Sequence, residues 1–498
     1  MKFFIKIYFI GLLGLGLALM MSCRKDTGNY NYIKINEAIV SNLDSLYIVN
    51  RGEILNINPK ISYSLDPTGD TVNYIYEWLL TKKEGSEAIV PKLLTSGPVF
   101  NSKIDLLTGV YNMLYRITDK RTGVWKEYPF QLFVTLRTYE GWLLLSEING
   151  QKSRLDMMSY KIRSNDYEQI HDVLAEMKSG FKLTGLPNFV CYNKEMGSGV
   201  NQTNEKILIS TTKEAGFLRG DIFDYHPINA FSNYMNGPDK ATDKGAKLEG
   251  EAWIAYMTIN GSIYYSGWTL KFSRISKIST SGKLFKAAPF ISFSDNQAIA
   301  FDEENSRFLW SPTESFEFYT YNNIPALNNM NKQMLFMTRT KYNGGETFAI
   351  LKDKTNSKIY LARLTYTKLN YLQEITDPNI AQAENFAVNS DYGYIFYNVG
   401  GVIYEYDFTL KLSKKMADYG NRKISILKFQ SINTGTTINQ ERYSKISNQL
   451  IVCSYDESNL DNSGTMDLYD VPAINGQITK VETFTGLGKV VSITYRTR

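Results

Sequence analysis

Short strand patterns repeat along almost the whole chain and leave few folds open to it. From Thr138 to Arg498, strands rich in Tyr and Ile alternate with turns that contain Asp, Asn or Gly. Clear strand pairs are 298–302 with 307–310, and 449–453 with 464–469. A propeller blade of four short strands takes roughly 40–50 residues. Region 138–498 is therefore predicted to form a β-propeller of about seven blades.

In region 33–137, short strand patterns also alternate with turns, and the turn sequences are clear. Strand patterns at 54–57, 73–78, 109–117 and 129–134 are separated by turns rich in Asp, Pro, Thr and Gly. About one hundred residues of this kind form one β-sandwich of the immunoglobulin type. Trp78 is predicted to be its buried core tryptophan, with stacking on a carbohydrate as the alternative. The whole chain is thus predicted to be all-β.

Two further patterns in region 138–498 concern the propeller. Residues 142–145 and 490–494 are apolar strand patterns at its two ends, so one sheet could combine strands from both ends. A helix is predicted near the start, capped by Asn165 and Glu168 and ended by Gly180. Its apolar face consists of Ile170, Val173, Leu174 and Met177.

The N-terminus has the order of zones that protein export requires. Lys2 and Lys6 supply positive charge, residues 7–21 are apolar, and a small serine precedes Cys23. The apolar stretch is shorter than the roughly 17–25 residues of a membrane-spanning helix. The five residues Leu-Met-Met-Ser-Cys that end at Cys23 resemble a bacterial lipobox. Residues 1–22 are therefore predicted to be a signal peptide, and Cys23 to be the lipidated first residue.

Segment 23–32 is hydrophilic and is predicted to be a lipid-anchored tether, through which the protein contacts a membrane. The remainder is predicted to be globular, because 43% of the residues are apolar and low-complexity tracts are absent from the sequence. The formal net charge of +5 is small for 498 residues and argues against nucleic-acid binding.

Cys191 and Cys453 are the cysteines that remain beside Cys23. Each lies in an apolar strand pattern, which favours two buried thiols that pack as small apolar side chains. A Cys191–Cys453 disulfide is the alternative that an oxidising compartment permits.

Several segments, taken in order, resemble the PKD-like lipoproteins of polymer-foraging Gram-negative bacteria. They are Cys23, 28–32, 35–37, 76–78, 109–111, 117–119, 141–147, 153–156 and 484–489. The resemblance implies a PKD-like sandwich on an outer-membrane lipoprotein that faces the cell surface or the periplasm, and we expect the cell surface. It also implies a SusC/SusD-like importer of glycans or peptides as a partner. It transfers no catalytic residue to this chain.

The chain offers little for histidine-based catalysis. Its two histidines, His171 and His226, stand in no zinc motif and beside no recognisable nucleophile. Both are interpreted as ordinary surface residues. A glycosidase needs only two carboxylates about 5–10 Å apart, so the 50 acidic residues keep an enzyme open as an alternative. No cofactor is expected.

One loop has the spacing of a calcium-binding loop, with Gly464 at the sharp turn. The oxygen ligands would be Asn459, Asp461, Ser463, Thr465, Asp467 and Asp470. The first position is Asn, the last is Asp where a bidentate Glu is usual, and the flanks are strand patterns. These departures favour a polar hairpin loop between two propeller strands.

Aromatic residues are abundant, with 35 Tyr, 26 Phe and 6 Trp, and most are assigned to cores. Trp268 and Trp310 stand beside turn residues and are the candidate ligand-binding side chains at a loop face. The leading hypothesis is a non-enzymatic binding or accessory protein of a nutrient uptake system. The alternatives are a hydrolase of glycans or peptides that uses a carboxylate pair, and a structural subunit of an outer-membrane transport complex.

Overall fold

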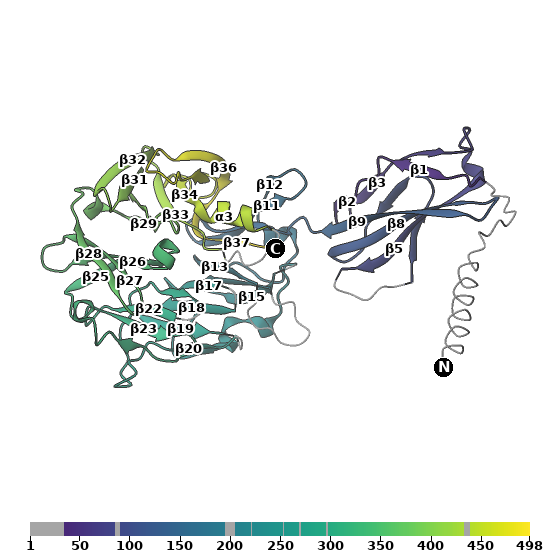
Figure 1. Cartoon of the computed structure of the whole chain (residues 1–498). Helices are drawn as coiled ribbons and strands as arrows, with labels where there is room; N and C mark the ends of the chain where they lie inside the picture. The colour runs from purple at the N-terminus through teal and green to yellow at the C-terminus, as the bar shows by residue number, and fades with distance from the viewer. Residues whose placement is uncertain are drawn as a thin grey trace, which may run out of the picture. The chain divides into compact units, whose positions relative to one another are not determined.

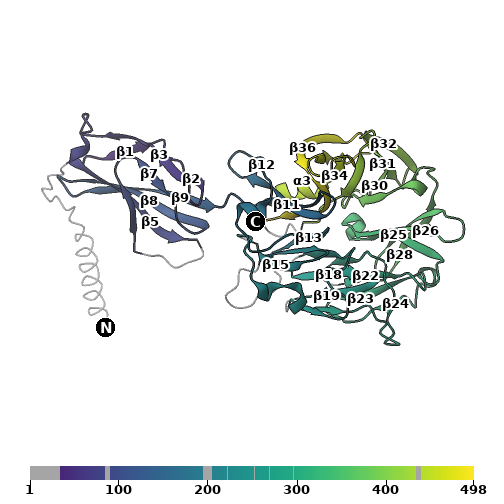
Figure 2. The same cartoon turned by 180° about the vertical axis from the view of Figure 1, so that it is seen from behind.

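The computed structural model describes residues 34–84, 90–194, 205–220, 222–251, 253–267, 270–294, 297–432 and 439–498. The predicted signal peptide, Cys23 and the tether lie outside these ranges. The chain divides into two units, Met1–Leu136 and Arg137–Arg498, and strands dominate the described part of both (Figures 1 and 2). The predicted all-β class is confirmed. No helix within the described ranges is long and apolar enough to span a bilayer.

The first unit is a β-sandwich. One layer is the five-stranded sheet β2-β9-β8-β5-β6, and the other consists of the pairs β1-β4 and β3-β7. The strands are β1 (Ala38–Ser41), β2 (Leu46–Asn50), β3 (Ile54–Ile57), β4 (Lys60–Tyr63), β5 (Tyr74–Lys83), β6 (Lys92–Ser96), β7 (Phe100–Lys103), β8 (Gly109–Asp119) and β9 (Trp125–Thr135). Along β8 and β9 burial alternates with a period of two, because successive side chains point to opposite faces of a sheet.

Trp78 lies at the centre of the sandwich core, as predicted. Its side chain is fully buried and stacks on Tyr115 with ring centroids 3.9 Å apart. Phe100 and Phe130 contact its ring edge to face. The indole N–H donates to the carbonyl oxygen of Gly97 at 2.9 Å. The only polar atom of this side chain is therefore satisfied inside the core.

The described part of the second unit contains seven sheets, numbered here in chain order. Sheet 1 is β37 (Lys489–Arg496), β10 (Gly141–Ile148), β11 (Lys152–Lys161) and β12 (Asp166–Ile170). Sheet 2 is β13 (Pro187–Asn193), β14 (Lys206–Thr211) and β15 (Ala215–Arg219). Sheet 3 is β17 (Lys247–Glu251), β18 (Ile254–Ile259), β19 (Ser262–Ser266), β20 (Phe272–Arg274) and β16 (Met235–Asn236).

The remaining four sheets have four strands each. Sheet 4 is β21 (Ser292–Ser294), β22 (Gln297–Asp302), β23 (Arg307–Pro312) and β24 (Tyr319–Thr320). Sheet 5 is β25 (Lys332–Arg339), β26 (Thr347–Asp353), β27 (Ile359–Leu364) and β28 (Leu369–Ile375). Sheet 6 is β29 (Asn385–Val388), β30 (Ile395–Val399), β31 (Val402–Asp407) and β32 (Leu412–Asp418). Sheet 7 is β33 (Lys423–Lys428), β34 (Gln449–Tyr455), β35 (Gly464–Asp470) and β36 (Thr479–Leu487).

Each sheet shares an apolar core with the next one, and sheet 7 shares one with sheet 1. Leu208 and Phe217 of sheet 2 pack with Met257 of sheet 3, and Ile451 of sheet 7 packs with Trp142 of sheet 1. The other neighbouring pairs are joined in the same way. The sheets therefore form a closed ring, which is the arrangement of a β-propeller.

The ring closes through sheet 1, which combines strands from both ends of the unit. β37 pairs antiparallel with β10, so that Leu143 faces Thr494 and Leu145 faces Ser492. The predicted pairing of residues 142–145 with 490–494 is confirmed. Closure covers the apolar faces that the first and last sheets of an open row would expose.

The helix predicted between Asn165 and Gly180 is wrong in its first half, which forms β12 and pairs with β11. Helical structure remains only in α2 (Val173–Glu176), which Asp172 caps. The predicted apolar side chains do enter a core, because a strand followed by one helical turn can bury the same residues. A second helix, α3 (Gln440–Asn448), precedes β34 and was not predicted.

Candidate functional site

One strand from each sheet faces the axis of the propeller. These strands are β37, β13, β17, β21, β25, β29 and β33, each at one edge of its sheet. Neighbours such as β13 and β17, or β29 and β33, contact each other around the ring (Figure 1). Side chains that point away from the cores between sheets therefore gather near the axis.

The short strand β17 directs charged side chains toward this centre. Leu248 is buried in the core between sheets 2 and 3, so the period of two places Lys247, Glu249 and Glu251 on the other side. Glu249 is accessible to solvent, although protein surrounds it. This combination places its carboxylate in the interior of the ring and not on the outer surface.

Three charged groups from sheets 3 and 7 interact electrostatically in this centre. Burial raises the pKa of Glu249 above its ordinary value, and the positive charges of Lys428 and Lys247 oppose that shift. Burial lowers the pKa of Lys247, and the charge of Glu249 opposes it. Lys428 also donates from its Nζ to the carbonyl oxygen of Ile493 on β37 at 3.2 Å.

Three phenylalanine rings continue this set along the inner strands. Lys247 Nζ lies 4.8 Å from the ring centroid of Phe290, a cation–π distance. Phe290 precedes β21, and its centroid lies 5.8 Å from that of Phe336 on β25. The Phe336 centroid lies 6.3 Å from that of Phe386 on β29. We call these residues the central cluster: Lys247, Glu249, Phe290, Phe336, Phe386 and Lys428.

The central cluster combines an apolar wall with charges of both signs. The rings offer contact area to hydrocarbon or aromatic groups, the lysines can bind an anion, and Glu249 can bind a cation. Arg339 and Glu251, on β25 and β17, also interact: burial lowers the pKa of Arg339, and the charge of Glu251 opposes this. The arrangement is suited to a ligand that has ionic and apolar parts.

The sequence predictions did not include the central cluster. The available signal was the strand 247–251, Lys-Leu-Glu-Gly-Glu, in which charge alternates with small or apolar residues. Phe336, Phe386 and Lys428 come from strands far away in the sequence, and no local pattern marks them as neighbours.

Of the two tryptophans predicted to reach a ligand, Trp310 is the one within the described residues. Trp268 lies outside the described residues. Trp310 lies on β23, half-buried, with its ring centroid 5.2 Å from that of Tyr319 and 5.9 Å from that of Tyr366. It packs against the core between sheets 4 and 5 and is not part of the central cluster.

The six residues of the predicted calcium loop are not brought together. Asn459, Asp461 and Ser463 lie between β34 and β35, whereas Thr465, Asp467 and Asp470 lie on β35. The Asp467 carboxylate accepts from Tyr419 at 2.6 Å, Thr483 at 2.6 Å and Lys480 at 3.0 Å. Asp470 accepts from Gln449, and Asp461 from the backbone N–H of Asn149. Within the described ranges, no three His, Cys, Asp or Glu side chains are grouped to hold a metal ion.

Neither the histidines nor the two cysteines of the propeller are counted in the central cluster. His171 is exposed, with Nδ1 3.7 Å from the buried carboxylate of Asp156. His226 Nδ1 accepts from the backbone N–H of Ile228 at 3.3 Å. Cys191 and Cys453 are free, buried thiols that belong to two different cores.

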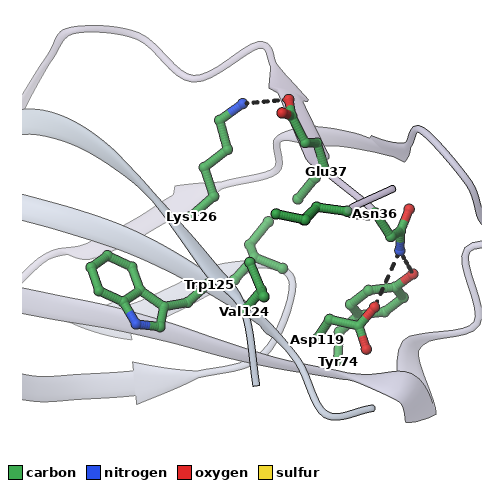
Figure 3. Close-up of a pocket in the computed structure, with 10 residues that line it drawn as sticks. Asn36, Glu37, Tyr74, Asp119, Val124, Trp125 and Lys126 are labelled. Atoms are coloured by element: carbon green, nitrogen blue, oxygen red, sulfur yellow. Dashed lines mark hydrogen bonds and ion pairs between the residues drawn. The ribbon is translucent and has the colours of Figure 1, made fainter. Parts of the chain in front are cut away.

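The sandwich has a pocket of about 200 Å³ beside the start of β1. Figure 3 shows Asn36 pointing toward Tyr74 and Asp119, to which its amide donates at 2.8 Å and 3.3 Å. Arg121 donates to Asp119 at 2.6 Å and holds the pKa of that carboxyl well below its usual range. The polar groups of this pocket largely satisfy each other, so we regard the central cluster as the stronger candidate site.

One family profile matches part of the chain. Residues 23–187 match the sequence profile described as the PKD-like family. The match includes the described sandwich and the strands β10, β11 and β12 of sheet 1. No curated protein matches the sequence.

Several solved structures are similar at low identity. A quinonprotein alcohol dehydrogenase-like protein from Bacteroides thetaiotaomicron is 14% identical, with 92% of this chain and 99% of that chain covered and a TM-score of 0.43. The WD40 domain of Pan2 from Neurospora crassa is 12% identical, with 60% and 80% covered and a TM-score of 0.31. Regucalcin from Agrobacterium tumefaciens is 6% identical, with 48% and 72% covered and a TM-score of 0.29. The propeller assignment therefore rests on the sheet order described above.

Proposed function

We propose that this chain is a non-enzymatic binding or accessory protein of a nutrient uptake system, held by lipid at the outer membrane of a bacterium. The observation that carries the proposal is the central cluster, in which exposed charges of both signs lie beside the half-buried rings of Phe290 and Phe336 inside a closed ring. Strands hold most of these side chains, so few of them would have to be ordered when a ligand binds. Its ligands would be glycans or peptides, and a SusC/SusD-like importer would be its partner.

The anchor of this proposal is Cys23. Lipidation there would fix the chain to the membrane, and segment 23–32 would serve as a tether. The sandwich would act as a spacer in a protein exposed at the cell surface. Cys23→Ala should abolish labelling by a radioactive fatty acid and move the protein out of the membrane fraction. Continued labelling and membrane retention of the variant would contradict the anchor.

The binding role is tested with the full chain purified in detergent. We expect oligosaccharides or peptides to bind, as measured by calorimetry, without release of shorter products. Binding that Phe336→Ala weakens would support the central cluster as the site. A chain that binds neither class of ligand but co-purifies with an importer would favour the structural alternative.

A second candidate function is hydrolysis by a carboxylate pair. Glu249 and Glu251 lie on the same side of β17, and two residues along a strand span roughly 6.6 Å. Inverting glycosidases separate their carboxyl groups by about 6.5–9.5 Å, and a raised pKa such as that of Glu249 suits a general acid. Turnover of a glycan that disappears in Glu249→Gln would make this the better account.

A further inference from the structure

We infer that the ligand of the central cluster is a short peptide with both termini free: a zwitterion whose carboxylate meets Lys247 or Lys428, whose ammonium meets Glu249, and whose apolar side chain lies on the phenylalanines. The inference rests on the proposed binding function and names the class of ligand for that site.

The first argument is that the carboxylate of Glu249 can still accept hydrogen bonds. Among the described residues, no hydrogen bond or ion pair reaches its carboxylate, and Lys428 and Lys247 act on it at longer range. Solvent reaches this carboxylate inside the ring, so it is free to pair with a ligand. A ligand ammonium would supply the missing charge-assisted hydrogen bonds.

The second argument is that the two lysines keep donors for an anion. Lys428 uses one N–H for the carbonyl oxygen of Ile493, and an ammonium group has three. Lys247 rests on the face of Phe290, a contact that leaves its N–H groups available. The charged centre therefore contains acceptor and donor groups, as both ends of a zwitterion require.

The third argument is the chemistry and the position of the rings. Phe290, just before sheet 4, and Phe336 of sheet 5 are half-buried, Phe386 of sheet 6 is buried next to Phe336, and the charges come from sheets 3 and 7 on either side. The wall carries no hydroxyl or indole N–H, so it complements hydrocarbon and aromatic surface. A neutral sugar would leave many hydroxyl groups without partners on such a wall.

The test compares four probes by calorimetry with the full chain in detergent: Gly-Gly-Phe and Gly-Gly-Gly with free termini, Gly-Gly-Phe acetylated and amidated, and maltotriose. We expect the free peptide to bind, the capped peptide to bind about tenfold or more weakly, and maltotriose not to bind. Glu249→Gln and Lys428→Met should each weaken the free peptide about tenfold. Phe336→Ala should weaken Gly-Gly-Phe more than Gly-Gly-Gly.

Lys415→Gln is the matched control, because Lys415 lies exposed on β32 and should leave binding unchanged. Thermal melting shows whether each variant folds, and the near-isosteric Glu249→Gln keeps the test valid if Phe336→Ala does not fold. Equal binding of free and capped peptides would overturn the inference, as would unchanged binding in Glu249→Gln and Lys428→Met. Binding of maltotriose alone would overturn the peptide assignment and preserve the proposed binding function, whereas binding of no probe would count against both.

Discussion

The carboxylate of Glu140 accepts a hydrogen bond of 2.8 Å from the hydroxyl of Tyr495, 355 positions further along the chain. Arg442 of α3 forms an ion pair with the same carboxylate at 2.8 Å. Glu140 has no exposed surface, so its charge depends on these two partners. They join the segment before β10, helix α3 and β37 at the point where the ring closes.

Removing this carboxylate should destabilise the propeller strongly. In Glu140→Ala, the partly exposed Arg442 loses its ion-pair partner and the buried Tyr495 hydroxyl loses its acceptor, which together should cost about 1–3 kcal/mol of unfolding free energy. Denaturant titration monitored by tryptophan fluorescence measures the change. The control is Lys415→Ala, which breaks the exposed pair with Asp418 and should cost no more than about 0.5 kcal/mol. Equal stability of the two variants would contradict the prediction.

The stability of the propeller should fall between weakly acidic and neutral pH because of Glu405. Both of its carboxylate oxygens are buried without a hydrogen-bond partner in the described residues. Burial first, and then the charge of Asp407, raise its pKa from 4.5 to about 7, and Lys414 opposes the shift. The folded chain therefore keeps a proton that the unfolded chain releases, which stabilises it fully below the lower pKa value.

This stabilisation is lost as pH rises through about 7, and the loss is on the order of 2–3 kcal/mol. Melting temperatures recorded between weakly acidic and neutral pH measure the slope, which is how steeply stability falls as pH rises. Glu405→Gln should flatten it, whereas Glu374→Gln, in an exposed pair with Lys358, should keep it. A slope that persists in Glu405→Gln would assign the pH dependence to another group.

The two propeller thiols should resist alkylation in the folded protein. Burial raises the pKa of Cys191 to about 12 and also raises that of Cys453, so little reactive thiolate forms. At mildly alkaline pH, both should react with iodoacetamide at least about a thousandfold more slowly than in guanidinium. Peptide mass spectrometry measures each rate. Rapid labelling of either cysteine in the native chain would show that solvent reaches that thiol and would contradict the prediction.

The second unit should fold without the first. It has its own ring of cores, and Arg137 at its start pairs with Glu168 and Glu176 of sheet 1 and α2. A fragment of residues 137–498 should therefore unfold cooperatively, at the same temperature as the corresponding transition of the full chain. A fragment without cooperative unfolding would show that the sandwich stabilises the propeller.

Much of the fold follows from local sequence. The sandwich strands and the burial of Trp78 were predictable because alternation over a few residues determines which face is apolar. The strands at 142–145 and 490–494 could be paired because each is a short apolar run that needs a partner. The helix near Asn165 was misassigned because the spacing of Ile170 and Val173 fits a helical face and also a strand followed by one turn.

The candidate site could not be predicted in the same way. Lys247 and Glu249 are two residues apart, but Phe336, Phe386 and Lys428 reach the axis only because sheets 5, 6 and 7 follow each other around a ring. Position around a closed ring is a property of the whole unit. For Trp310, the neighbouring turn residues in the sequence suggested a position on a loop face. In the structure its ring packs near Tyr319 of sheet 4 and Tyr366, which follows β27.

The place of β37 in sheet 1 also sets the order in which the molecule can assemble. During synthesis from the N-terminus, the sandwich is complete once β9 has emerged at Thr135. Sheet 1 then waits for residues 489–496, with the side of β10 that faces β37 unpaired until the last strand arrives. Pairing across such a distance in sequence is slow, and unpaired strand edges invite wrong partners. A newly made chain therefore passes through a stage with a folded sandwich and an open propeller, the stage at which a chaperone would be needed.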